Sequence, residues 1–185
     1  MKRLLLCLLL LSTPVLAHAQ PSQAQQTINA KGLIDWLTAR LWFRETHGNN
    51  RSPAIDALTK AGGGQLGWPW CGYTQLANQQ ANKLPFPKEA GAARAWFVDK
   101  LRTYFLVGQR GALDSLRPGH LVGLSYGNGI NHVTRAVEIF PRLRKGRPPR
   151  GAWCIGGNEG RGTTAGIHRT YYAGPAIRAA SNYNY

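Results

Sequence analysis

Acidic residues are scarce in this sequence: 8 Asp and Glu stand against 23 Lys and Arg, and the formal net charge is +15. A chain with so few carboxylates is attracted to polyanions, namely nucleic acid, anionic lipid or an acidic polymer of the cell envelope. The sequence contains no nucleic-acid-binding motif. Charge alone does not choose between these partners, but export, if the protein is exported, favours the envelope polymer and the lipid surface over nucleic acid.

Long apolar runs are also missing, apart from one at the N-terminus. That run, 4–11, is well short of the roughly 20 residues that a membrane-spanning helix needs. It follows Lys2 and Arg3 and precedes the small-residue site Ala17-His18-Ala19, a pattern typical of a secretory signal peptide over 1–19. We therefore expect cleavage near Ala19 and a secreted or periplasmic protein. A lipoprotein signal at Cys7 fits poorly, because small residues do not precede the cysteine.

Cysteine is rare, and close-spaced metal-binding pairs are lacking. Cys7 leaves with the signal peptide, so Cys71 and Cys154 remain. In an oxidising compartment, such a pair is a candidate disulfide. A zinc site built from both cysteines with His132 and His168 has suitable ligand types, but the sequence contains no CxxC or HxxxH pair. We expect no metal and no cofactor.

The remaining chain fits one domain, without internal repeats or an interdomain linker. We predict a flexible N-terminus over 20–27, a catalytic domain over 28–175 and a C-terminal tail over 176–185. Apolar periodicity and Gly or Pro breaks predict helices over 28–45, 53–60, 69–82 and 90–99, followed by strands over 101–107, 120–125, 132–140, 153–157 and 168–172. Helices followed by antiparallel strands indicate an α+β fold, with N-terminal helices packed on a small antiparallel sheet.

The stretch Pro69-Trp70-Cys71-Gly72 places a thiol where a helix should begin. The positive end of a helix dipole stabilises a thiolate, and the free N–H groups of the first turn can hold a developing oxyanion. Cys71 is therefore the candidate nucleophile. Two interpretations remain for Trp68, Trp70 and Trp153: they line a cleft for sugar or peptide, or they pack in the core.

An activated cysteine needs a base and a group that orients the base. His132 starts the longest strand-like run and is the favoured base, with His168 and His120 as the alternatives. Asn158 and Glu159 are both candidates for orienting the ring, and Glu138 is a third choice. Glycines flank Asn158, so it could equally be a turn residue.

Several segments resemble the CHAP-type amidases and peptidases, which belong to the NlpC/P60 and papain-like group. They are 49–56 (Asn-Asn-Arg-Ser-Pro-Ala-Ile-Asp), 67–71 (Gly-Trp-Pro-Trp-Cys), His132-Val133 and 155–158 (Ile-Gly-Gly-Asn), and the resemblance spans 31–172. It implies a papain-like fold and peptidoglycan as substrate, with Cys71 as nucleophile, His132 as base and Asn158 as orienting residue. By the same resemblance, Gln65 corresponds to an oxyanion-hole glutamine.

Two positions depart from the pattern of that family. The usual acidic residue after Pro-Gly is His120 here, and Gly156 stands where many members have Glu before Gly-Asn. Both changes remove a carboxylate near the expected base, so they bear on the strength of catalysis.

We therefore predict a secreted cysteine amidase or endopeptidase that cleaves an amide of peptidoglycan through a thioester. Gln65, Trp70 and Glu159 are candidates for oxyanion or substrate contacts. Peptidoglycan is the expected partner, with anionic envelope polymers as secondary ones and no specific nucleic acid; the sequence identifies no immunity or inhibitor protein. The alternative is a non-catalytic wall-binding or polyanion-binding module with a Cys71–Cys154 disulfide. An exported cationic toxin or DNA-binding protein is a third hypothesis.

Overall fold

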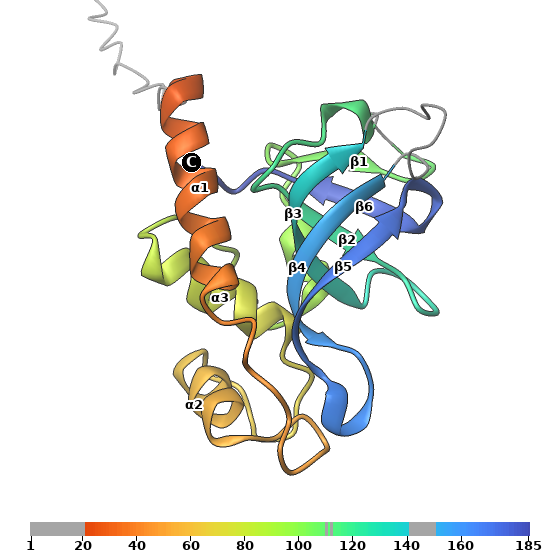
Figure 1. Ribbon diagram of the computed structural model, residues 1–185. Helices are drawn as coiled ribbons and strands as arrows, with labels where there is room; N and C mark the ends of the chain where they lie inside the picture. Colours follow the sequence, from red (N-terminus) through yellow and green to blue (C-terminus); the bar gives the residue numbers. More distant parts are fainter. Residues whose placement is uncertain (1–20, 110, 112, 141–150) are drawn as a thin grey trace, which may run out of the picture.

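The computed structural model describes residues 21–109, 111, 113–140 and 151–185. The predicted signal peptide and the basic segment 141–150 lie outside the described residues. In the described part, three α-helices gather on one side of a six-stranded antiparallel sheet (Figure 1). The predicted α+β class is confirmed. No helix in these ranges combines the length and the apolar character that crossing a bilayer requires.

Serine side chains cap the first two helices. Helix α1 spans Gln23–Thr38, and the Ser22 hydroxyl accepts a hydrogen bond from the backbone N–H of Gln25. Helix α2 spans Pro53–Ala61, where Ser52 caps the backbone N–H of Ile55 and proline takes the first turn. Helix α3 spans Cys71–Ala81. The prediction that Cys71 lies at the start of a helix is therefore confirmed.

Helix α1 is displaced from its predicted range 28–45. It starts inside the segment predicted to be flexible, because Ser22 provides a cap there. It ends before residue 45, where Arg44 pairs with Gly166 as an isolated β-bridge. The predicted helix over 90–99 is also wrong, since only a 3-10 helix forms, over Ala93–Phe97. The indole of Trp96 donates to the Ala90 carbonyl there.

The sheet has the order β1-β6-β2-β3-β4-β5, and every neighbouring pair is antiparallel. Its strands are β1 Thr103–Leu106, β2 Leu121–Leu124, β3 His132–Phe140, β4 Gly151–Glu159, β5 Gly166–Ala173 and β6 Ile177–Ser181. The hairpin from β2 to β3 and the pairing of β3 with β4 bring the start of β3 and the end of β4 close together. These two strand ends carry the chemistry described below.

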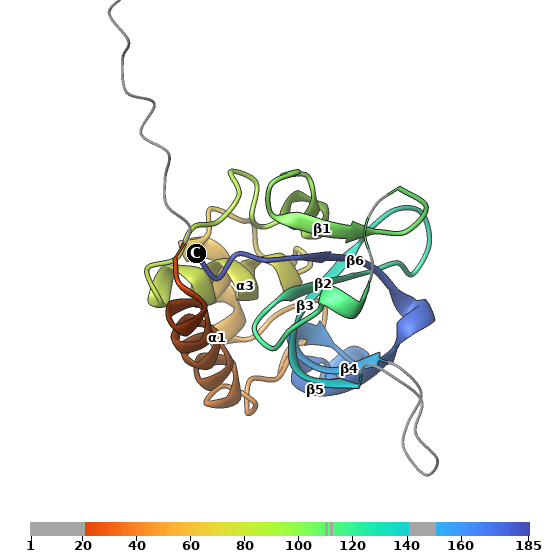
Figure 2. The same cartoon turned by 90° about the horizontal axis from the view of Figure 1, so that it is seen from above.

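The predicted C-terminal tail is wrong. Residues Ile177–Ser181 form β6, which lies between β1 and β2 inside the sheet, and the chain then returns to α1 (Figure 2). The Asn29 side chain donates to the Asn184 carbonyl at 2.6 Å and ties the C-terminus to this helix. Ala179 and Ala180 are fully buried. Alanine has little strand propensity, so the sequence gives a weak signal for a strand that needs small side chains.

Two apolar clusters hold the layers together. The larger lies between the helices and the sheet, and it includes Leu37, Ile55, Trp70 and Trp96. The smaller includes Val122, Ala152 and Cys154, all from strands. Helix α3 packs directly against β3 and β4. This contact fixes the start of α3 next to the strands that carry His132 and Glu159.

Candidate active site

Cys71 is the first residue of α3 and is 3% exposed. Trp70 precedes it as the N-cap and makes no side-chain capping bond. The first intrahelical bond runs from the Thr74 N–H to the Trp70 carbonyl, at 2.9 Å. Because the first-turn N–H groups have no carbonyl one turn back, they are available to an anion beside the sulfur. Cys71 therefore has the position at a helix N-terminus that the sequence predicted.

His132 is the first residue of β3 and lies against Cys71. Its Nε2 is 3.1 Å from Oε1 of Glu159, so the ring donates to the carboxylate. Burial lowers the pKa of His132, but hydrogen bonds to Cys71 and Glu159 and their negative charge outweigh burial and raise the pKa to about 10. With Nε2 bonded to Glu159, Nδ1 is the nitrogen left for the thiol. The ring is thus held between a sulfur and a carboxylate.

Glu159, rather than Asn158, makes the orienting bond. The β4–β5 register shifts between Gly156 and Glu159, and Asn158 has a left-handed φ of 60°. A bulge with such a residue turns the following side chain to a new direction, and here it brings the carboxylate to His132. Asn158 lines the cleft, and within the described ranges no hydrogen bond joins its amide to the ring.

Two tyrosines extend this chain of contacts. The Tyr172 hydroxyl donates a short hydrogen bond to Oε2 of Glu159, and the Tyr126 hydroxyl donates to the Tyr172 oxygen at 3.3 Å. The Tyr126 ring also lies 5.8 Å from the His132 ring, centroid to centroid. Both carboxylate oxygens of Glu159 are therefore engaged. Sequence reasoning missed both tyrosines, because nothing in their local pattern separates them from ordinary strand and turn aromatics.

The two glycines before Asn158 let β4 approach its neighbours, α3 at Gly157 and β3 at Gly156. A Cβ on Gly157 would lie 2.0 Å from the Thr74 hydroxyl oxygen and 2.6 Å from the Trp70 ring. A Cβ on Gly156 would lie 2.6 Å from the Thr134 hydroxyl oxygen. Only glycine fits at such distances. Gly157 therefore sets the spacing between β4 and the helix bearing Cys71, and Gly156 sets the approach of Thr134 on β3.

We expect Gly157→Ala to destabilise the fold by about 2 kcal/mol, because the added methyl group forces α3 and β4 apart. Urea unfolding measures this change. Gly127→Ala is the matched control, since the nearest atom to its Cβ is 3.9 Å away, and it should change stability by less than about 0.5 kcal/mol. Equal effects of the two substitutions would contradict the close packing inferred at Gly157.

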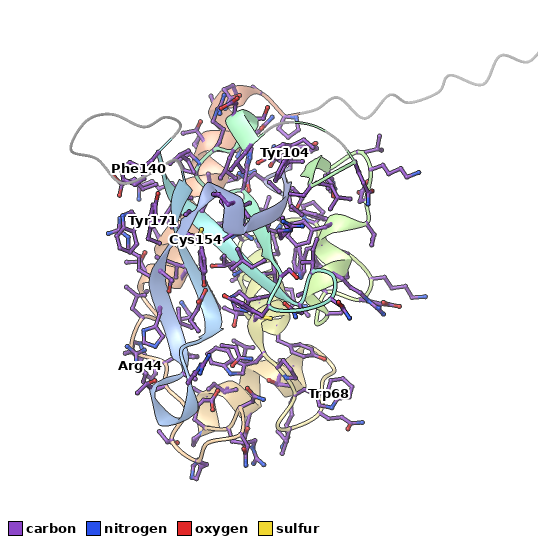
Figure 3. All side chains as sticks on the ribbon, turned by 90° about the vertical axis from the view of Figure 1, so that its right-hand side faces the viewer. Arg44, Trp68, Tyr104, Phe140, Cys154 and Tyr171 are labelled. Carbon is purple, nitrogen blue, oxygen red and sulfur yellow. The ribbon has the colours of Figure 1, made fainter. Side chains whose placement is uncertain are left out.

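Trp70 and Gln65, the predicted substrate or oxyanion contacts, line neither of the two cavities beside Cys71. Trp70 is fully buried, and its indole N–H donates to Oε1 of Glu45 at 3.2 Å. It therefore anchors the start of α3 from inside the core. Gln65 is exposed in the loop before α3 and lines neither cavity beside Cys71. Of the three tryptophans considered for the cleft, Trp70 is buried and Trp153 is partly buried, whereas Trp68 is 46% exposed (Figure 3).

The alternative bases lie apart from the thiol. His120 is buried with its Nδ1 2.7 Å from the Tyr104 hydroxyl, and burial together with the charges of Arg135 and Arg117 lowers its pKa to about 4. The Nε2 of His168 lies 2.7 Å from the Thr164 carbonyl oxygen. His168 lines the cleft but makes no bond to Cys71 among the described contacts. His132 is the imidazole that the fold brings to the nucleophile.

The two remaining cysteines are free thiols. Cys154 is fully buried in the strand cluster, and burial raises its pKa. Figure 3 shows it within the sheet. The disulfide of the alternative hypothesis is therefore not formed.

Two cavities meet at Cys71. One has a volume of about 630 Å³ and the other about 890 Å³, and both are lined by Pro69, Cys71 and Asn131. Because they share these residues, the two cavities adjoin at Cys71, and we call them the smaller and the larger half of the cleft.

Comparison of this chain with protein-family models, curated proteins and solved structures finds no match.

Proposed function

We propose that this protein is a secreted or periplasmic cysteine hydrolase that cleaves an amide bond of peptidoglycan. The observation that carries the proposal is the contact series from Cys71 through His132 to Glu159 at a helix start. A cysteine on a helix next to a histidine on an antiparallel sheet supports a papain-like assignment. The resemblance to CHAP-type enzymes supports the substrate.

The geometry supports a two-step acyl transfer. Protonated His132 stabilises a negative sulfur at Cys71, which attacks the amide carbonyl. The N–H groups of the first turn of α3 hold the oxyanion. His132 gives its proton to the leaving nitrogen, so the C–N bond breaks and a thioester remains. Water then loses a proton to His132 and attacks the thioester, the C–S bond breaks, and the acid is released, which restores the thiolate and the protonated His132.

Export and charge support the location and the partner. The N-terminal pattern predicts a signal peptide, and the excess of Lys and Arg attracts the protein to an anionic envelope. Free Cys71 and Cys154 argue against the disulfide-bonded binding module.

Alkylation during wall digestion tests this proposal. Iodoacetamide should label Cys71 and abolish the release of new amino groups from purified sacculi, because the thiolate is both nucleophile and target. Mass analysis locates the label, and buried Cys154 provides an internal control that should stay unlabelled in folded protein. Digestion that continues after complete alkylation of Cys71 would reject the mechanism.

A further inference from the structure

The two halves of the cleft differ in chemistry. The smaller half has an aromatic and small-residue lining that includes Trp68, Phe86, Ala90 and Gly91. Trp68 and Phe86 are 46% and 45% exposed, which is unusual for such large apolar side chains. Its charged residues Lys88, Glu89 and Arg94 include both signs. This half offers apolar ring surface to a ligand.

The larger half is cationic. Arg161, His168 and Arg169 line it together with His132 and Glu159. The Glu159 carboxylate is engaged by His132 and Tyr172, so it does not neutralise the arginines. Arg169 pairs with Glu138 at 2.7 Å. Arg161 is exposed, and among the described residues it has no carboxylate within ion-pair distance. Its guanidinium is therefore available to an anionic ligand.

The position of His132 indicates which half of the cleft holds each fragment of the substrate. When the tetrahedral intermediate collapses, the leaving nitrogen must take its proton from the imidazolium. His132 lines the larger half and not the smaller one. The amine fragment therefore leaves into the larger, cationic half, while the acyl fragment stays on Cys71 in the aromatic half.

We infer, on the basis of the proposed function, that Arg161 binds a carboxylate of the amine fragment and that the acyl fragment carries a sugar. The apolar face of a sugar ring packs on exposed aromatic surface such as Trp68 and Phe86, and a guanidinium pairs with carboxylates through two parallel hydrogen bonds. In peptidoglycan, the amide between the lactyl group of the sugar and the acidic stem peptide has this polarity. Its hydrolysis leaves the sugar as an acid and the peptide with a free amine.

Two matched substrates test this assignment: a muramoyl tripeptide with free carboxylates and the same compound with those carboxylates amidated. The wild-type protein should prefer the free acid by about 10-fold or more in kcat/KM, since a charge-assisted pair is lost on amidation. Arg161→Gln should remove most of this preference, mainly through KM. Arg178→Gln is the control, because this exposed arginine on β6 lines neither half.

The products separate failure of the inference from failure of the proposed function. Mass analysis should find a sugar without peptide and an intact peptide with a free amine. Cleavage within the peptide, or a preference that survives in Arg161→Gln, overturns the direction assigned here while the hydrolase remains. Absence of any hydrolysis by the wild-type protein overturns both.

Discussion

Replacing Cys71 by Ala should abolish wall hydrolysis, lowering kcat by at least about 10⁴-fold. The substitution removes the atom that forms the thioester, and the remaining groups can only bind and polarise the substrate. The fold should survive, because the side chain is small and lies at the start of α3 rather than in its middle. Release of soluble fragments from purified sacculi measures the activity, and circular dichroism checks the fold.

Cys154→Ala is the matched control for this substitution. Cys154 is also a buried free thiol, but it lies in the strand cluster. Losing its sulfur should cost about 1 kcal/mol of stability and leave kcat unchanged below the melting temperature. Residual hydrolysis in Cys71→Ala close to the wild-type rate would show that another group acts as the nucleophile.

The sequence was sufficient to locate the thiol and the imidazole. Pro69 and the glycine-rich loop before it mark the start of α3, and the turn over 126–129 marks the start of β3. These are local signals, because backbone conformation at a helix or strand start is set by a few neighbouring residues. Bringing Cys71 to His132 then needed only the packing of one helix on one sheet.

The third member of the site depended on information that is not local. Asn158 and Glu159 are adjacent, and a one-residue change in register decides which of them faces His132. The bulge between Gly156 and Glu159 makes that choice through pairing with β5. Tyr172 joins the site by the same pairing. The burial of Trp70 could not be predicted from local sequence either, because its hydrogen-bond partner Glu45 lies 25 residues earlier in the chain.

Strand β6 shows the same limit for the fold. Its sequence, Ile-Arg-Ala-Ala-Ser, has a single β-branched residue, Ile177, and no aromatic one, whereas a typical strand is rich in both. Ala179 packs in the larger apolar cluster and Ala180 in the smaller one, so β6 buries small side chains on both faces of the sheet. Tertiary packing therefore selects a strand where local propensity favours a tail.

Replacing Glu159 by Gln should lower kcat/KM on the order of 10³-fold and move the alkaline limb of the pH–rate profile to lower pH. His132 must stay protonated to stabilise the anionic sulfur, and its pKa of about 10 depends in part on Glu159. Without the Glu159 charge, burial outweighs more of the remaining stabilisation, so the pKa of His132 is lower than in the wild type. The wild-type profile should fall only near pH 10, and the variant profile should fall earlier. An unchanged alkaline limb would show that Glu159 does not hold the proton on His132.

Tyr172→Phe provides the comparison that separates charge from positioning. It removes the hydrogen bond to Oε2 of Glu159 but keeps the carboxylate, so its alkaline limb should stay near that of the wild type while kcat falls modestly.

The free energy of unfolding should also depend on the proton that His132 holds. A histidine whose pKa rises from 6.5 to about 10 on folding stabilises the folded protein fully below about pH 6.5, and this contribution is lost as pH rises toward 10. The free energy of unfolding, measured in urea between pH 6 and pH 10, should therefore decline less steeply in Glu159→Gln than in the wild type. A common origin in His132 requires the kinetic and the stability changes to appear together, since both depend on the same charge beside the ring.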